Sequence, residues 1–99
     1  RVSFDNGVEL DADNVFAVFP QHAPDLFVSA GLTDPTGFIP VDLLTNRLKG
    51  KGDSGRNVFA IGDACSALIP KTGKPHPKAG EFAWQMGTAV AANIRASVC

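Results

Sequence analysis

Residues 57–66, Asn-Val-Phe-Ala-Ile-Gly-Asp-Ala-Cys-Ser, contain the strongest fold signal in this chain of 99 residues. Val58 to Ile61 is a short, continuously apolar run, which predicts a strand covered on both faces, as in an α/β sheet. The Gly62-Asp63 pair that follows would place a carboxylate at the carboxyl end of the strand, where α/β folds bind ligands. An ionised Asp accepts hydrogen bonds from sugar-type hydroxyl groups, but Asp63 could equally cap the backbone N–H groups of a turn.

The sequence after this strand predicts a long helix. Pro77-Lys78-Ala79-Gly80 precedes a stretch rich in small and apolar residues, and we expect one helix over residues 81–98. Gly80 would let a ligand approach the first turn, whose free N–H groups and dipole favour negative charge. The simpler alternative is a capped helix with a solvated Lys78 side chain.

The first half of the chain predicts β structure with one short helix. Asn6-Gly7 lies between Val2 to Phe4 and Val8 to Leu10, which alternate between apolar and polar residues, and this pattern is typical of a β-hairpin. The next predicted elements are a buried strand over 15–19 that ends at Pro20, a helix over 23–30 capped by Gly31, and short strands over 38–39 and 41–44. Residues 46–57 are predicted to be a solvated surface loop, and residues 66–80 a second loop rich in Pro, Gly and Lys. We therefore expect a single partial α/β domain over 1–99, with a β-rich segment over 1–45 and the Gly-Asp strand plus long helix over 58–99.

Composition excludes several classes of function. Hydrophobic residues make up 44% of the chain, charged residues make up 19%, and the formal net charge is -1. This balance argues against a nucleic-acid-binding module, which would carry a strongly basic face. Two cysteines and two histidines make neither a disulfide framework nor a metal site, so no metal is predicted. The chain opens in strand-like sequence without an initiator Met, and we expect it to be a piece of a larger protein.

Several blocks of sequence together resemble a flavoprotein family, the two-dinucleotide-domain disulfide reductases. Within that superfamily they look most like sulfide:quinone oxidoreductases and the flavoprotein subunit of flavocytochrome c sulfide dehydrogenase. The matching blocks, in order, are Ala12–Pro24, Ala30–Asp34 followed by Gly37–Asp42, Asn57–Ser66, and Pro77–Gly80 with Gln85 and Val90–Ile94. The resemblance implies the second half of a three-layer, Rossmann-like FAD-binding domain with a β-hairpin and one long C-terminal helix.

The resemblance also implies where FAD would bind. Asp63 would accept a hydrogen bond from the FAD ribitol, and the backbone that follows it would face the pyrophosphate. The start of the long helix would lie under the isoalloxazine edge, and Pro20 would line the flavin or the neighbouring substrate channel. The implied cofactor-binding residues are Gly62, Asp63, Ala64, Lys78, Ala79, Gly80 and Pro20.

The implied function is part of an FAD-dependent oxidoreductase that oxidises sulfide or a related sulfur donor. Electrons would pass through the flavin to a quinone or a cytochrome. One alternative is a flavoprotein like the type II NADH:quinone oxidoreductases, and another is a small non-enzymatic α/β binding module. The only G-x-G-x-x-G spacing, Gly50 to Gly55, falls within the predicted loop 46–57 and opens no predicted helix, so the chain lacks the fingerprint that would hold the ADP moiety of FAD. We therefore expect the isolated segment to be inactive, to retain little FAD, and to self-associate through surfaces that the remainder of the FAD domain would cover.

The cysteines and histidines give no catalytic assignment. Sulfide oxidation in the family uses a redox-active cysteine pair beside the flavin, but neither Cys65 nor Cys99 can be assigned to it, so the catalytic residues stay unknown. His22 lies in the Pro20–Pro24 corner, where a functional role is open, and His76 is predicted to be a solvated loop residue. Similar proteins are membrane-peripheral or periplasmic, and the sequence predicts no compartment.

Overall fold

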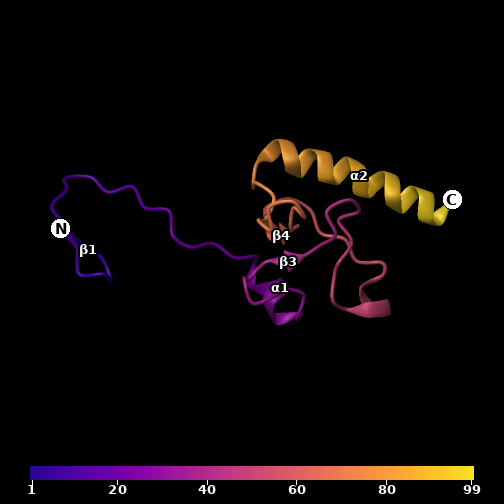
Figure 1. Ribbon diagram of the computed structural model, residues 1–99, viewed down its shortest axis with the longest axis horizontal. Coiled ribbons are helices and arrows are strands. Elements are labelled where there is room, and N and C mark those ends of the chain that lie inside the picture. The colour runs from indigo at the N-terminus through magenta and orange to yellow at the C-terminus, as the bar shows by residue number, and fades with distance from the viewer.

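The computed structural model describes residues 1–99 and divides the chain into an extended arm, residues 1–21, and a body, residues 22–99 (Figure 1). The molecule measures 60 × 28 × 27 Å, and its radius of gyration is 17.4 Å. A compact chain of this length would have a radius of gyration of about 13 Å. The accessible surface is 7613 Å², whereas a compact monomer of this mass would expose about 5,400 Å². The arm accounts for this elongated shape.

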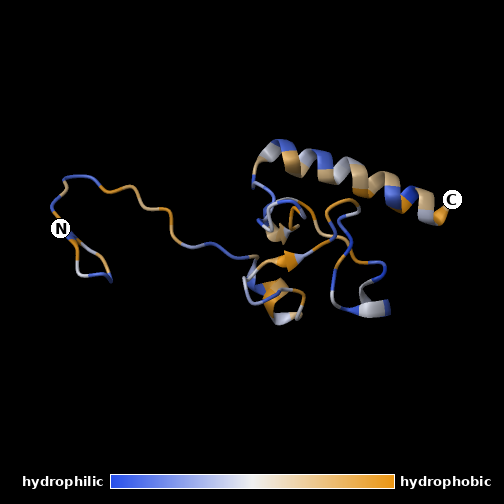
Figure 2. Ribbon diagram, viewed as in Figure 1, coloured by the Kyte–Doolittle hydropathy of each residue, from blue (hydrophilic) through white to orange (hydrophobic).

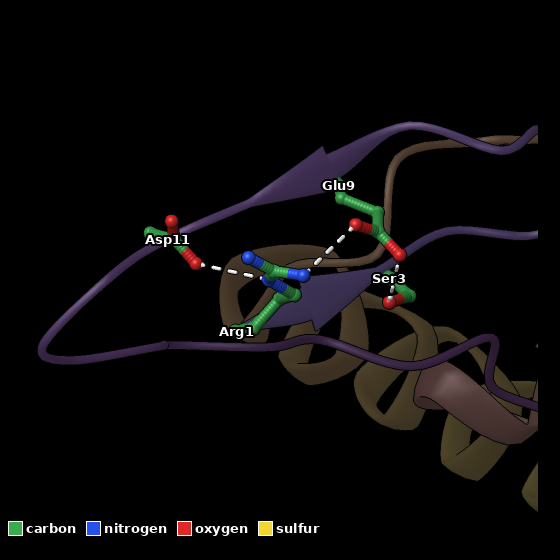
Figure 3. Close-up of polar contacts among 4 residues, drawn as sticks. All are labelled: Arg1, Ser3, Glu9 and Asp11. Carbon is green, nitrogen blue, oxygen red and sulfur yellow. Dashed lines mark hydrogen bonds and ion pairs between the residues drawn. The ribbon is translucent and has the colours of Figure 1, made fainter.

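The arm begins with the predicted hairpin, which the structure confirms. Strand β1 (Val2–Ser3) pairs antiparallel with β2 (Glu9–Leu10). Gly7, at φ +83°, takes the left-handed position of a three-residue loop, and the Phe4 N–H donates to the Val8 carbonyl at 2.9 Å. The Arg1 guanidinium contacts carboxylate oxygens of Glu9 at 3.3 Å and Asp11 at 3.2 Å (Figure 3). These ion pairs are exposed and stabilise the hairpin only slightly.

The strand predicted over residues 15–19 does not form, and that prediction is wrong. These residues are extended without strand pairing, and the side chains of Phe16 and Val18 are 99% and 90% exposed. Figure 2 shows the apolar stretch leading away from the body. Alternate side chains of an extended chain point to opposite sides, and here both sides are apolar. Such a segment forms a stable strand only inside a sheet covered on both faces, and the body provides no such sheet.

The body starts with the predicted short helix. Helix α1 (Asp25–Ser29) lies within the predicted range, and Gly31 follows it at φ +67°, donating its N–H to the Val28 carbonyl at 3.0 Å. Strand β3 (Ile39–Pro40) then pairs in parallel with β4 (Cys65–Ser66), with Ile39 opposite Cys65. The strand predicted over 41–44 is reduced to a single bridge between Val41 and Leu48. The Asp42 carboxylate accepts hydrogen bonds from the Leu44 and Thr45 N–H groups, which turns the chain there.

The strand predicted over Val58 to Ile61 is present only as an extended segment. It joins the preceding loop through one bridge, Arg47 to Phe59, and through the Leu48 N–H to the Val58 carbonyl at 2.9 Å. The prediction that 46–57 is wholly a solvated loop is wrong at its start, because Asn46 and Leu48 are buried. The Asn46 side-chain amide donates to the Ala60 carbonyl at 3.1 Å, and this bond fixes the extended segment. A short 3-10 helix, η1 (Gly52–Gly55), occupies the loop.

The core is small and lies between α1, the parallel pair β3–β4 and the start of the loop. It consists of Ala23, Ile39, Val41, Leu48, Cys65 and Ala67. The predicted C-terminal helix is confirmed as α2 (Gly80–Val98), which lies along one side of the body (Figure 1). Only Val90 of α2 is buried, and Trp84 is 73% exposed. None of the helices is long and apolar enough to cross a membrane. The architecture is a small mixed α/β arrangement with two two-stranded sheets and one long C-terminal helix.

Candidate functional site

The Gly-Asp motif forms a tight turn that packs on the first two turns of α2. Residues Gly62–Ala64 form the 3-10 helix η2, with Gly62 in the left-handed region at φ +68°. The Gly62 N–H points at the Met86 sulfur at 3.4 Å. A Cβ atom built on Gly62 would lie 3.5 Å from the Cβ of Ala83. Since 3.5 Å is an ordinary van der Waals contact, the glycine is needed for the left-handed backbone conformation and not for space.

The start of α2 is open. The Ala83 N–H donates to the Ala79 carbonyl at 3.1 Å, and no side chain caps the helix. The N–H groups of Gly80, Glu81 and Phe82 precede that bond, so they lack intrahelical partners. A Cβ atom built on Gly80 would meet nothing within 4 Å. The helix start thus combines free N–H donors with open space, which suits the approach of an electron-rich group.

The Asp63 side chain, in the turn that packs on α2, is available to a ligand. Asp63 is exposed, and its side chain makes no hydrogen bond or ion pair within the chain. The alternative that Asp63 caps backbone N–H groups is therefore not what the structure shows. An exposed, unpaired carboxylate can accept hydrogen bonds from hydroxyl groups.

The Lys78 side chain joins the turn to the helix start. Its ammonium group donates to the main-chain carbonyls of Asp63 at 2.8 Å and Cys65 at 2.7 Å. It also lies 3.9 Å from the centroid of the Phe38 ring, which adds a cation–π attraction. The alternative of a freely solvated Lys78 side chain does not fit these contacts. Sequence reasoning missed Phe38 and Met86, since only the tertiary fold brings them to the turn.

The structure gathers six of the seven predicted cofactor-binding residues. Gly62, Asp63 and Ala64 form the turn, and Lys78 links them to Ala79 and Gly80 at the start of α2. Pro20 lies elsewhere, at the junction of the arm and the body. There it lines a hollow of about 440 Å³ together with His22, Asp25 and Thr36, none of which belongs to the turn or to α2.

Cys65 is a buried thiol directly below the turn. Its Sγ donates to the Gly62 carbonyl at 3.2 Å and lies 4.0 Å from the Met86 sulfur. Burial raises the pKa of the Cys65 thiol, and the nearby Lys78 charge opposes that rise. Cys99 is exposed at the end of α2, and both cysteines are free. The buried thiol has no partner cysteine, so its contacts are those of a packing residue.

The prediction that His76 is a solvated residue is wrong. His76 is 6% exposed, and its Nδ1 accepts a hydrogen bond from the Ala67 N–H at 3.1 Å, which leaves the ring proton on Nε2. The backbone N–H of His76 donates to the Ala67 carbonyl at 2.9 Å, and Leu68 bridges to Pro75. These pairs form a small hairpin around Pro70–Gly73. The turn-forming residues at that site were the sequence signal that could have placed His76 opposite Ala67.

The burial of His76 predicts a pH dependence of stability. Burial, with the Lys78 charge as a second cause, lowers the pKa of His76 below its ordinary value, which is about 6.5. Below about pH 6.5, His76 therefore takes up a proton in the unfolded chain but not in the folded chain. The free energy of unfolding is at its full value above this pH and decreases as the pH falls. We expect denaturant unfolding midpoints to decrease from pH 7 to pH 5.

The matched control is His76→Asn, whose side-chain oxygen can still accept from the Ala67 N–H. This variant should show a flatter profile over the same range. Hydrogen bonds from Thr45 lower the pKa of Asp42, so its contribution is lost only in more acidic solution, below about pH 4. If the denaturant unfolding midpoint of the natural chain stayed constant from pH 7 to pH 5, His76 would not be neutral and buried in the folded chain.

No protein-family model matches the chain. No solved structure matches it either.

Proposed function

We propose that this chain is part of an FAD-dependent oxidoreductase that oxidises sulfide or a related sulfur donor and passes electrons through the flavin to a quinone or a cytochrome. One observation carries the proposal: the Gly62–Ala64 turn and the open start of α2 lie together, joined by Lys78. The sequence blocks that resemble sulfide:quinone oxidoreductases contain these same residues. Because Lys78 contacts backbone carbonyls, the direct contacts with the flavin would come from the other residues of the turn and of the helix start.

The residues present fit the flavin and ribityl part of FAD. The free Asp63 carboxylate would accept a hydrogen bond from a ribityl hydroxyl group. The N–H groups at the start of α2 would face the N1–C2=O edge of the isoalloxazine, which becomes negatively charged on reduction. The open space at Gly80 would let that edge approach the backbone. When bound, FAD supplies the electron-transfer chemistry, and the chain holds it and stabilises its reduced form.

The ADP end of FAD would be held by residues outside this segment. The only G-x-G-x-x-G spacing, Gly50 to Gly55, lies in the loop that contains the short 3-10 helix η1. The motif that binds a dinucleotide pyrophosphate instead opens a helix directly after a strand. We propose that the body is the second half of a three-layer, Rossmann-like FAD-binding domain. Its parallel pair β3–β4 supports this assignment, because parallel strands occur almost only in covered α/β sheets. The apolar residues 15–19 of the arm would then lie in a sheet supplied by the rest of the protein.

Neither cysteine is proposed as catalytic. Oxidation of sulfide would require a cysteine disulfide that sulfide can attack, whereas Cys65 is a free, buried thiol whose pKa is raised by burial. The exposed Cys99 lies at the far end of α2 from the turn. The cysteines that would react with sulfide are therefore expected in the rest of the protein.

The test is the FAD content of the native polypeptide, meaning the complete natural protein that contains this segment, and of the isolated 99-residue chain. We expect about one FAD per native polypeptide and little or none on the isolated chain, which holds only part of the site. FAD is released by denaturation and quantified against protein concentration. A folded native polypeptide without flavin would contradict the proposal and favour a non-enzymatic binding module. Tight, stoichiometric FAD on the isolated chain would contradict the claim that half of the site lies elsewhere.

A further inference from the structure

We infer that Lys78 is a positioning residue, which holds the Gly62–Ala64 turn in place for the flavin and does not itself bind the flavin. This inference rests on the proposed function. The ammonium group carries three N–H donors. Two of them are directed at the carbonyl oxygens of Asp63 at 2.8 Å and Cys65 at 2.7 Å.

The position of these carbonyls makes the contact specific to the turn. Asp63 is the middle residue of η2, and Cys65 is the residue that ends it. One cation therefore binds the chain on both sides of Ala64 and fixes the orientation of the two peptide groups. The turn has no side-chain cap of its own. Within the turn, the Cys65 N–H donates to the Gly62 carbonyl, and two weaker contacts involve sulfur atoms. Cys65 also pairs with Ile39 between β4 and β3. Lys78 adds two hydrogen bonds from a charged donor, which are stronger than those between neutral groups.

Phe38 restricts the Lys78 side chain further. The ammonium nitrogen lies 3.9 Å from the centroid of the Phe38 ring. Phe38 directly precedes β3, and β3 pairs with β4, whose first residue is Cys65. The cation is thus held between the ring beside one strand and the carbonyls at the start of its partner strand. Without the cation, the main chain on both sides of Ala64, which carries the Asp63 side chain, would lose this constraint.

If Lys78 only positions the turn, it should affect the affinity for FAD without affecting the redox potential of the bound flavin. A cation in contact with the isoalloxazine would stabilise the reduced, negatively charged form, so its removal would lower the midpoint potential. A cation that only orders the turn affects how well FAD fits and leaves the potential of bound flavin unchanged. Because hydrogen bonds from a charged donor are strong, we expect Lys78→Met to weaken FAD binding by the native polypeptide about tenfold.

The experiment compares three variants of the native polypeptide by FAD titration and by potentiometry of the bound flavin. Lys78→Met should lose affinity and keep the midpoint potential. Lys78→Arg should recover most of the affinity, since a guanidinium can also donate to two carbonyls. Lys74→Met removes a lysine of the same loop whose side chain makes no hydrogen bond or ion pair, and it should behave like the natural protein. A lowered potential with unchanged affinity in Lys78→Met would overturn the inference.

A local measurement on the isolated 99-residue chain separates this inference from the proposed function. Amide hydrogen exchange of Cys65 reports the turn directly, because its N–H donates to the Gly62 carbonyl. Lys78→Met should speed this exchange several-fold and Lys74→Met should not. Unchanged exchange in Lys78→Met would overturn the positioning role whether or not FAD binds. Faster exchange combined with a native polypeptide that lacks flavin would refute the proposed function alone.

Discussion

Replacement of Gly80 by valine is expected to weaken FAD binding by the native polypeptide about 10- to 100-fold, because overpacking of a closely fitted contact costs about 1–3 kcal/mol. In the isolated chain, a Cβ atom on Gly80 meets nothing within 4 Å. In the proposed complex, the flavin edge occupies that space. The measurement is the dissociation constant of FAD, obtained by titration of the apoprotein.

Two controls separate this effect from damage to the helix. Gly80→Val should leave the stability of the isolated chain unchanged or slightly raised, since glycine is the poorer helix former. Gly87→Ala changes another glycine of α2, whose added Cβ would lie at an ordinary 3.6 Å from Ile61, and it should keep the natural affinity. Natural FAD affinity in Gly80→Val would show that the helix start does not face the flavin.

Replacement of Gly37 by alanine is expected to destabilise the isolated chain by about 2–4 kcal/mol, from left-handed strain and overpacking together. Gly37 has φ +83°, and an added Cβ would lie only 2.8 Å from the Cβ of His22. The Gly37 carbonyl also accepts from the Ala23 N–H at 2.8 Å, so this glycine fixes the point where the arm enters the body. A loss of this size is a large part of the stability of a small domain. Urea unfolding measures it.

The matched control for this prediction is Gly50→Ala. Gly50 has a similar φ of +80°, but an added Cβ there would meet nothing within 4 Å. It should therefore show only the strain of the left-handed conformation, about 1–2 kcal/mol. Equal losses in the two variants would mean that the contact between Gly37 and His22 does not constrain the junction.

Local sequence signals predicted the elements that depend on neighbours along the chain. The hairpin at Asn6-Gly7, the short helix before Gly31 and the helix that starts at Gly80 all appear in the structure. Each depends on a glycine at a defined backbone position or on the periodicity of a long apolar segment. The turn at Gly62-Asp63 was likewise predictable, because glycine followed by Asp is typical of the residue types that end a strand in a turn.

Predictions failed where the outcome depends on distant segments. The apolar residues 15–19 have the composition of a buried strand, but a strand needs partners, and these are absent from the body. His76 lies between two prolines and was predicted to be a solvated loop residue, yet the hairpin around Pro70–Gly73 buries it against Ala67. The partners of Lys78 could not be predicted for the same reason. Its contacts with Asp63, Cys65 and Phe38 join residues 13 or more positions apart.

The most direct test of the central claim is the visible absorption spectrum of the native polypeptide, recorded before and after anaerobic addition of sulfide. The proposal predicts a flavin band that sulfide bleaches, since electrons from the sulfur donor reduce the bound FAD. A flavin band that NADH bleaches and sulfide does not would contradict the sulfur donor and favour a flavoprotein like the type II NADH:quinone oxidoreductases. A freshly purified, folded polypeptide with no flavin band would contradict the account as a whole.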